Sequence, residues 1–185
     1  METSQSVIPA QAESVEEIFT QLVHAHVDEL YNYASYMVFD RDDADDIVQK
    51  TFISLHQQLS KLDMTKPIKP WLFRVAKNQC LDYFKAKKAS VFSELSETFV
   101  EDIPESAPGL DEQLSSDLFL EQVREQIKQL PLPAREILLL KYFEEFTFEE
   151  IADILSLPVN TVKTSFYRGK VKLLRLLEDS RIKAS

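Results

Sequence analysis

The chain has 185 residues, of which 44% are hydrophobic and only 2 are glycine, and its formal net charge is −10 at pH 7. This length suits one ordinary domain or two small ones. No apolar run reaches the roughly 18 residues of a membrane span, no signal peptide is evident, and the single cysteine, Cys80, excludes a disulfide framework and a cysteine-based zinc site. We therefore expect a cytoplasmic protein without membrane insertion.

Helix-forming residues dominate, and no segment alternates cleanly with period two, so we expect an all-α fold. Residues 1–14 are polar and lack periodicity, and we expect them to be disordered. Ser14 and Glu17 have the spacing of a capping box, which predicts the start of a helix. Apolar residues at helical spacing then continue to Phe39.

Five acids lie within the seven residues 40–46, at the start of the next expected helix. A calcium-binding EF-hand loop does not fit, because Ala44, Asp45 and Thr51 would fall where oxygen, glycine and glutamate are needed. We therefore predict neither a metal site nor a cofactor. Acids at a helix N-terminus also complement the helix dipole. A second interpretation is a docking face for a basic helix of another protein, with acidic and apolar residues within one turn of each other.

A loop punctuated by Pro67 and Pro70 precedes a helix that we expect to open at Trp71. Its cations are interleaved with aromatic residues (Trp71, Phe73, Arg74, Lys77, Tyr83, Phe84, Lys85, Lys87 and Lys88). Cations with aromatics suit single-stranded nucleic acid, since phosphates take the charge and unstacked bases take the rings. Trp71 and Tyr83 could equally be packing residues, and the sequence leaves this choice open.

Most of the net charge comes from one segment. Nine acids and no Lys or Arg lie between Ala89 and Glu121. The segment also contains Pro104, Pro108 and Gly109 and has few aliphatic residues. We therefore expect residues 89–114 to be an acidic linker between two small helical domains, at residues 15–88 and 115–180.

The C-terminal region has the pattern of a helix-turn-helix motif. Thr147 is a candidate N-cap for a first helix, and Pro158 ends the connection before a second. From Val159 to Arg175 the second helix has five cations and no acid. Such a helix can lie in the major groove of DNA. An ordinary helical hairpin with a solvated basic face is the alternative.

Three segments together carry a family resemblance: DADDIVQKTF, WLFRVAKNQCLDYFK and LPLPAREILLLKYFEEFTFEEIADILSLPVNTVKTSFYRGK. In this order they closely resemble the extracytoplasmic-function (ECF) sigma factors of the sigma-70 family. The resemblance covers residues 15–88 and 115–178. It implies a promoter-specificity subunit without catalytic activity, with sigma domain 2 followed by the helix-turn-helix sigma domain 4.

The resemblance also implies partners and sites. The partners are core RNA polymerase, through its β′ coiled coil and β flap, promoter DNA, and an anti-sigma factor. The linker would thread the polymerase cleft. The implied core-polymerase contacts are Asp45, Asp46, Ile47, Val48, Gln49 and Phe52; the −10 DNA contacts are Lys69, Trp71, Arg74, Lys77, Asn78 and Tyr83; and the −35 DNA contacts are Asn160, Thr161, Lys163, Thr164, Arg168 and Lys170.

The chain departs from the family pattern at four positions. Lys50 stands where glutamate is common, Asn160 and Ser156 where glycine is frequent, and Ser165 where arginine is frequent. The missing cation at Ser165 predicts weaker phosphate contact or an altered −35 preference.

Three other functions fit part of the chain. A helix-turn-helix regulator that binds operator DNA without polymerase explains only residues 115–180. An enzyme with a metal site at residues 40–46 lacks a second set of ligands. The third is an anti-sigma-like or adaptor protein that binds polymerase without DNA, which unchanged activity after charge reversal of Lys163 and Arg168 would favour.

Overall fold

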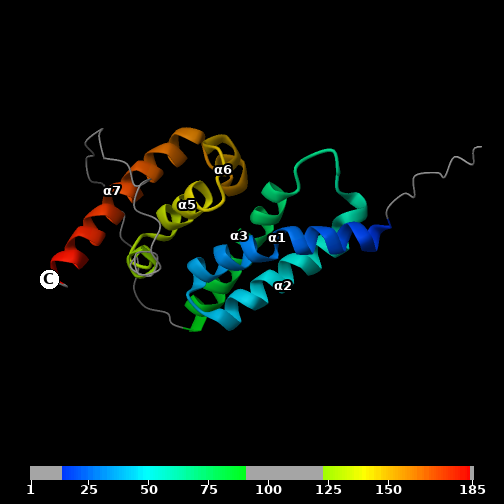
Figure 1. Cartoon of the computed structure of the whole chain (residues 1–185), viewed down its shortest axis with the longest axis horizontal. Helices are drawn as coiled ribbons and strands as arrows, with labels where there is room; N and C mark the ends of the chain where they lie inside the picture. Colours follow the sequence, from blue (N-terminus) through cyan, green and yellow to red (C-terminus); the bar gives the residue numbers. More distant parts are fainter. Residues whose placement is uncertain (1–13, 91–122, 184–185) are drawn as a thin grey trace, which may run out of the picture.

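The computed structural model describes residues 14–90 and 123–183, and in these ranges the chain is helical and without strands. The expected disordered N-terminus and most of the expected acidic linker lie outside the described residues. The labelled elements are α1 (Val15–Val38), α2 (Arg41–Gln58), the short 3₁₀ helix η1 (Leu59–Lys61), α3 (Lys69–Ser90), α5 (Leu132–Tyr142), α6 (Phe148–Leu155) and α7 (Val159–Lys183) (Figure 1). Residues 123–127 are also helical. The all-α expectation is confirmed.

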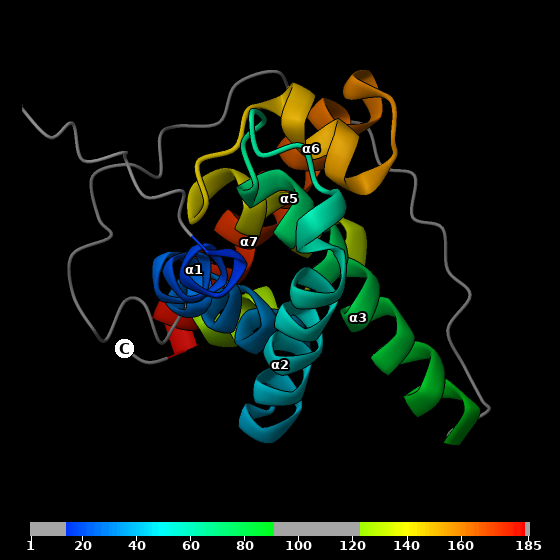
Figure 2. The same cartoon turned by 90° about the vertical axis from the view of Figure 1, so that its right-hand side faces the viewer.

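Helices α1, α2 and α3 form the first domain. The predicted capping box is present at the start of α1, where the Glu17 amide donates to Ser14 Oγ and the Ser14 amide donates to Glu17 Oε2. Helix α1 packs against α2 and α3 through fully buried residues such as Leu30, Leu55 and Leu72. Figure 2 looks nearly along α1 and shows α2 and α3 beside it.

Helix α3 begins two residues earlier than expected, at Lys69 instead of Trp71. Pro70 therefore lies inside the first turn, where its missing N–H costs no helical hydrogen bond. This shift makes Lys69 the first residue of α3 and not part of the preceding loop.

Residues 123–127, α5, α6 and α7 form the second domain. The predicted N-cap Thr147 is confirmed, and Glu150 completes a capping box with it. Helices α5 and α7 approach closely at Gly169, where an added Cβ would lie 3.1 Å from Ala134 Cβ and 3.2 Å from Leu138 Cδ1. A larger side chain at this position would push α7 away from α5.

The two domains share one continuous core. The Tyr33 and Phe73 rings of the first domain meet edge to face with centroids 5.3 Å apart. Phe73 also meets Phe146 of the second domain at 5.3 Å. Phe73, one of the aromatic residues interleaved with the cations of α3, is therefore a core residue, since its ring is completely buried between the domains. Cys80 is also fully buried, as expected, and burial raises the pKa of its thiol.

The connection between α6 and α7 contains a backbone strain that one substitution should relieve. Ser156 ends α6 in the left-handed region, at φ 56°. We expect Ser156→Gly to raise the free energy of unfolding by about 0.5–1 kcal/mol, because glycine adopts this conformation without a Cβ clash. Urea unfolding measures the change. Asp153→Gly, at an exposed position inside α6, is the control and should be destabilising by a similar amount; a loss of stability in Ser156→Gly would contradict the argument.

Candidate protein and nucleic-acid interfaces

Helix α2 presents an exposed polar face near its N-terminus. Asp45, Asp46 and Gln49 are exposed, as predicted for a docking surface. Asp46 Oδ2 accepts a hydrogen bond from Lys50 Nζ at 2.6 Å, so the residue that departs from the family pattern partly neutralises this acid. Ile53, which the sequence analysis did not single out, is 55% exposed one turn further along and adds an apolar surface to the same helix.

Three predicted members of that docking surface are core residues instead. Ile47, Val48 and Phe52 are buried in the first domain, between 3% and 8% exposed. Their hydrophobic pattern marked the inner face of α2 and not a surface for another protein. They can hold the helix in place, but they offer little area for contact. Of the predicted docking residues, Asp45, Asp46 and Gln49 are thus the exposed ones, and Ile53 is exposed beside them.

The acids of residues 40–46 do not form a metal site in the structure. Asp40 caps α2, its Oδ1 accepting from the Asp43 amide at 3.1 Å. In the described ranges 14–90 and 123–183, no group of three His, Cys, Asp or Glu side chains is placed to hold a metal ion. The acids here serve helix capping and the surface charge of α2.

Helix α3 exposes part of its predicted DNA-contact set. Arg74 and Asn78 are exposed, and Lys77 is half-buried. Trp71 and Tyr83 are also half-buried and pack against the core, and Tyr83 Oη accepts a hydrogen bond from Lys87 Nζ at 2.6 Å. Both rings therefore contribute to packing while keeping some accessible surface.

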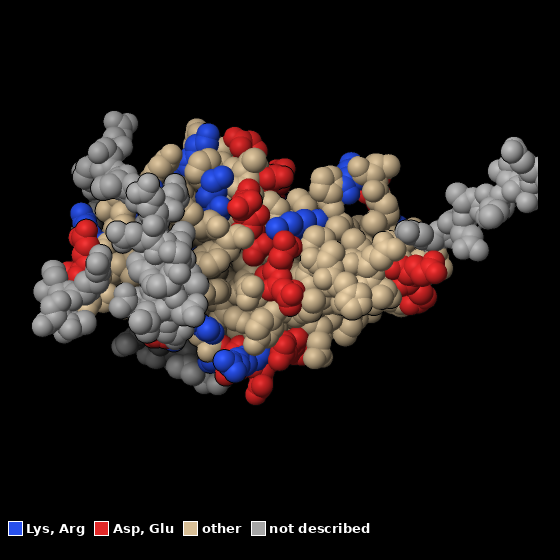
Figure 3. All heavy atoms as spheres, viewed as in Figure 1, with Lys and Arg blue, Asp and Glu red and all other residues tan. Residues whose placement is uncertain are grey.

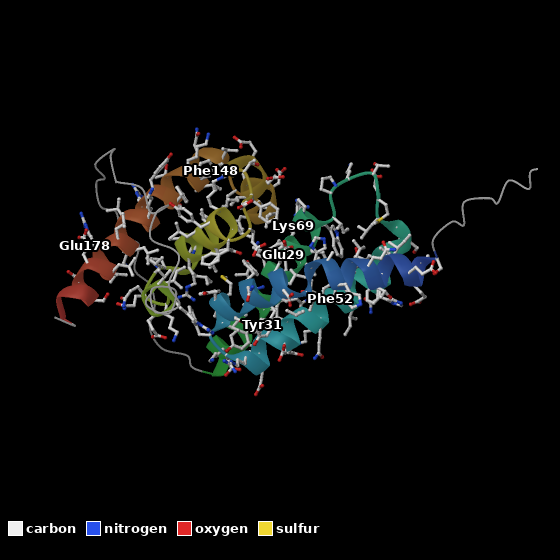
Figure 4. All side chains as sticks on the ribbon, in the orientation of Figure 1. Glu29, Tyr31, Phe52, Lys69, Phe148 and Glu178 are labelled. Carbon is white, nitrogen blue, oxygen red and sulfur yellow. The ribbon has the colours of Figure 1, made fainter. Side chains whose placement is uncertain are left out.

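Lys69 is the predicted −10 contact with the most partners inside the protein. Its Nζ lies 2.9 Å from Glu29 Oε1 of α1 and 3.1 Å from Glu144 Oε2 of the second domain. Burial alone would lower the pKa of Lys69, but the hydrogen bond to Glu29 and the ion pair with Glu144 outweigh burial and raise it. Lys69 stays charged and is bound by acids of both domains. Figure 4 shows Lys69 and Glu29 together near the junction between the domains.

The N-terminal half of α7 carries an open polar face. Its residues line a shallow hollow of about 300 Å³, formed by Asn160, Thr161, Thr164, Ser165 and Arg168. Four of the predicted −35 contacts are exposed there: Asn160, Thr161, Thr164 and Arg168. Tyr167, 54% exposed, lies beside this face and was not predicted. Threonine and asparagine at base edges with arginine nearby suit the donors and acceptors of the major groove.

The other two cations among the predicted −35 contacts, Lys163 and Lys170, are less exposed. Lys163 Nζ lies 5.7 Å from the centre of the Phe148 ring and 3.9 Å from Glu149 Oε1, both on α6. Lys170 is half-buried. Lys163 therefore joins the two helices of the motif as well as adding charge beside the hollow. Figure 3 shows Lys and Arg side chains in the region of α6 and α7, with acids close by.

A buried polar pair between the domains was not visible in the sequence. Tyr33 Oη of α1 donates a hydrogen bond to Glu136 Oε1 of α5 at 2.9 Å, across 103 residues of chain. Burial raises the pKa of Glu136 to about 7, although the Tyr33 hydrogen bond and nearby Lys77 act to lower it. From the sequence REILLLKY alone, Glu136 is expected on the exposed polar face of a helix. Only the packing of α5 on α1 shows that it is buried.

A half-buried arginine, Arg135, joins the same two domains. Arg135 Nη1 donates to the Met37 carbonyl of α1 at 3.0 Å, and its guanidinium lies 4.9 Å from the centre of the Phe39 ring. Arg135 also donates to three carbonyls of its own domain, those of Ile127, Lys128 and Leu130. The side chain therefore fixes the end of α1 against the start of the second domain.

No helix in the described residues has the length and apolarity needed to cross a membrane.

The family model for Sigma-70 region 2 matches residues 22–90, and the model for Sigma-70 region 4 matches residues 120–173. The first match contains most of α1 and all of α2 and α3, and the second contains the helix-turn-helix of α6 and the N-terminal part of α7.

Similar proteins point to the same family. The chain is 28% identical over 171 residues to the ECF RNA polymerase sigma factor SigW of Bacillus subtilis, covering 89% of this chain and 91% of SigW. It is 31% identical over 166 residues to the RNA polymerase sigma factor NccH of Alcaligenes xylosoxydans xylosoxydans, covering 89% of each. The solved structure of CnrH in complex with the cytosolic domain of CnrY superposes with a TM-score of 0.66 at 26% identity, covering 89% of this chain and 90% of CnrH. The chain belongs to the ECF sigma factors of the sigma-70 family.

Proposed function

We propose that this sigma factor uses the surface residues of α2 to bind core RNA polymerase and those of α3 and α7 to read promoter DNA. The observation that carries this assignment is the open polar face of α7, because its hollow is lined by residues able to contact base edges. We also propose residues 15–88 and 115–180 as the functional boundaries of the two domains. The protein acts as a regulator of initiation with polymerase in the cytoplasm, and catalysis belongs to the polymerase.

Each surface has a distinct task in this proposal. Asp45, Asp46 and Gln49 meet a basic helix of the polymerase, the β′ coiled coil, while the second domain meets the β flap. Arg74 and Asn78 lie one turn apart on α3 and are exposed, so they can hold the phosphates and bases of a separated −10 strand. Thr161, Thr164 and Arg168 approach the −35 duplex in the major groove.

An anti-sigma factor is a further partner that we propose. The related CnrH was solved in complex with the cytosolic domain of CnrY, and that complex supports a regulator of the same kind for this chain. Such a partner would bind across the surfaces that polymerase and promoter use.

Run-off transcription with purified core polymerase on a pool of promoter fragments tests the function. Initiation at a defined set of start sites that depends on this protein supports it. Specific binding to duplex DNA by the protein alone, with no stimulation of polymerase, would instead favour the operator-binding regulator. The same experiment identifies the −10 and −35 sequences by alignment of the start sites.

The polymerase contact can be tested separately from DNA reading. We expect Asp46→Ala to weaken binding to core polymerase about tenfold, as loss of a charge-assisted contact at the interface is typically worth 1–2 kcal/mol. Fluorescence anisotropy with labelled protein measures the affinity. Asp153→Ala removes an exposed acid of α6 and serves as the control, with unchanged affinity expected. Equal affinities for Asp46→Ala and the wild type would remove α2 from the proposed polymerase surface.

A further inference from the structure

The exposed face of α2 carries a cation among the residues proposed to meet polymerase. Four exposed residues stand at positions i, i+3, i+4 and i+7 and therefore share one face of the helix: Asp46, Gln49, Lys50 and Ile53. Figure 1 shows α2 along the edge of the first domain that faces away from α6. Lys50 thus lies one turn after the proposed acidic contact Asp46 and just before the apolar residue Ile53, near the centre of this face.

Lys50 and Asp46 form an ion pair on this face. Lys50 Nζ donates a hydrogen bond to Asp46 Oδ2 at 2.6 Å, and the two side chains are 54% and 57% exposed. An ion pair this exposed adds little to the stability of a fold, because water solvates both charges nearly as well. The pair can therefore be removed without loss of the helix, and its main effect is expected on a partner that binds this face.

The pair is an obstacle to a basic partner. An ammonium or guanidinium group of the partner can bind Asp46 Oδ2 only by displacing Lys50 Nζ or by sharing the carboxylate with it. Lys50 also repels the incoming cation, and like charges placed together across an interface reduce affinity. Both effects act near the centre of the face, where an interface excludes water best and charges interact most strongly.

We propose that Lys50 attenuates the docking of this sigma factor on core RNA polymerase, by holding Asp46 and by placing a positive charge near the centre of the docking face. This inference rests on the proposed role of α2 in binding a basic helix of the polymerase. Its consequence is a gain of function, since the loss of one exposed lysine strengthens the complex in which that lysine lies. A residue that only supported the helix would have the opposite effect or none.

The first measurement is the affinity of full-length variants for core polymerase by fluorescence anisotropy. Lys50→Met removes the charge and keeps most of the apolar stem, and we expect it to bind about fivefold more tightly than the wild type at low salt. The gain should shrink as salt is raised, because exposed charges are screened. Lys50→Arg keeps the cation and should bind like the wild type. Lys61→Met removes an exposed cation of η1 and controls for net charge, with nearly unchanged affinity expected.

The second measurement is a double-mutant cycle that tests whether Lys50 acts through Asp46. Asp46→Ala is expected to weaken binding about tenfold when Lys50 is present. Combined with Lys50→Met, the same change should weaken binding about thirtyfold, because the carboxylate is then free for the partner alone. Thermal melts of all variants should nearly coincide with that of the wild type, since an exposed pair adds little stability. Equal losses in the two backgrounds would contradict the claim that Lys50 holds Asp46 away from polymerase.

Two further results would overturn the proposal while leaving the docking surface in place. Weaker binding by Lys50→Met would show that Lys50 is a direct contact to an acidic group of polymerase. Unchanged affinity of Lys50→Met, with Asp46→Ala still weakening binding, would show that the lysine has no effect on docking. A different pattern marks the failure of the proposed function: if neither Asp46→Ala nor Lys50→Met changes the affinity, α2 is not the polymerase surface, and the inference about Lys50 is overturned with it.

Discussion

Charge reversal at two positions of α7, Lys163→Glu/Arg168→Glu, is expected to reduce run-off transcription from −35-dependent promoters roughly 100-fold or more. Each lost contact to a base edge is typically worth 1–3 kcal/mol, and the introduced acids also repel nearby phosphates. Arg168 lines the hollow on the exposed face of α7, so it is the stronger contributor. Transcription is measured with native and scrambled −35 sequences, and the loss should appear only with the native one.

The matched control keeps the same helix and the same change in charge. Lys172 and Arg175 are exposed two or more turns later on α7. We expect the loss of transcription in Lys172→Glu/Arg175→Glu to be at least tenfold smaller than the loss in Lys163→Glu/Arg168→Glu. The N-terminal residues of a recognition helix reach the bases, whereas later ones reach phosphates. Lys163 also lies near Glu149, and a thermal melt therefore accompanies each variant. Equal losses in both double variants would show that α7 contributes only general electrostatic attraction.

The second large effect concerns stability and pH at Glu136. Its folded-state pKa is raised by burial to about 7, against an ordinary value of 4.5. A carboxyl group with a raised pKa stabilises the folded state below about pH 4.5, and this stability is lost as pH rises through 7. The loss amounts to about 3 kcal/mol, at 1.36 kcal/mol for each pKa unit. The wild type therefore carries an unfavourable buried charge at pH 8.

Glu136→Gln should remove that penalty. Glutamine keeps an oxygen to accept the Tyr33 hydrogen bond but never ionises, so we expect the variant to be up to about 3 kcal/mol more stable than the wild type at pH 8. At pH 5 the difference should shrink to about 1 kcal/mol or less. The groups facing Glu136 are Tyr33 of α1 and Lys77 and Cys80 of α3. The tyrosine and the thiol have pKa values raised by burial and stay neutral across this range.

Urea unfolding at the two pH values measures this difference. Glu178→Gln makes the same charge change at an exposed position of α7 and should leave stability nearly unchanged at both. A constant difference between Glu136→Gln and the wild type from pH 5 to pH 8 would contradict the assignment of a buried, titrating carboxyl.

Local signals in the sequence predicted the helices well. The capping box that begins α1 and the N-cap Thr147 that begins α6 were both predicted, and Pro158 marks the start of α7. Such features depend on contacts within one turn of chain, which a linear pattern records directly. The exposed polar residues at the N-terminal half of α7 follow from the same periodicity.

The contacts between domains could not be predicted in this way. Tyr33 and Glu136 are 103 residues apart in the sequence, and the local sequence around either residue gives no indication that it contacts the other. Phe73 resembled the aromatic residues beside it, yet it is buried because Phe146 of the second domain covers it. On α2, Ile47 formed part of an apolar stripe whose partner could have been another protein or the domain's own core. A stripe shows that a face is buried and does not show what buries it.

The close approach of α5 and α7 bears on how such a protein could be given new promoter preferences. Gly169 leaves Ala134 and Leu138 almost no room for a larger side chain, and Val162 and Phe166 are buried on the same helix. The exposed positions of α7 between these buried residues can vary without changing how the helix packs against α5. A recognition helix transplanted from a relative should therefore retain glycine at 169 and the two buried apolar residues, and differ only at the exposed ones. A transplanted helix without glycine at 169 would be displaced from α5, and all its exposed side chains would shift relative to the DNA groove. Any change in its promoter preference would then result from the displaced helix and not from the new side chains.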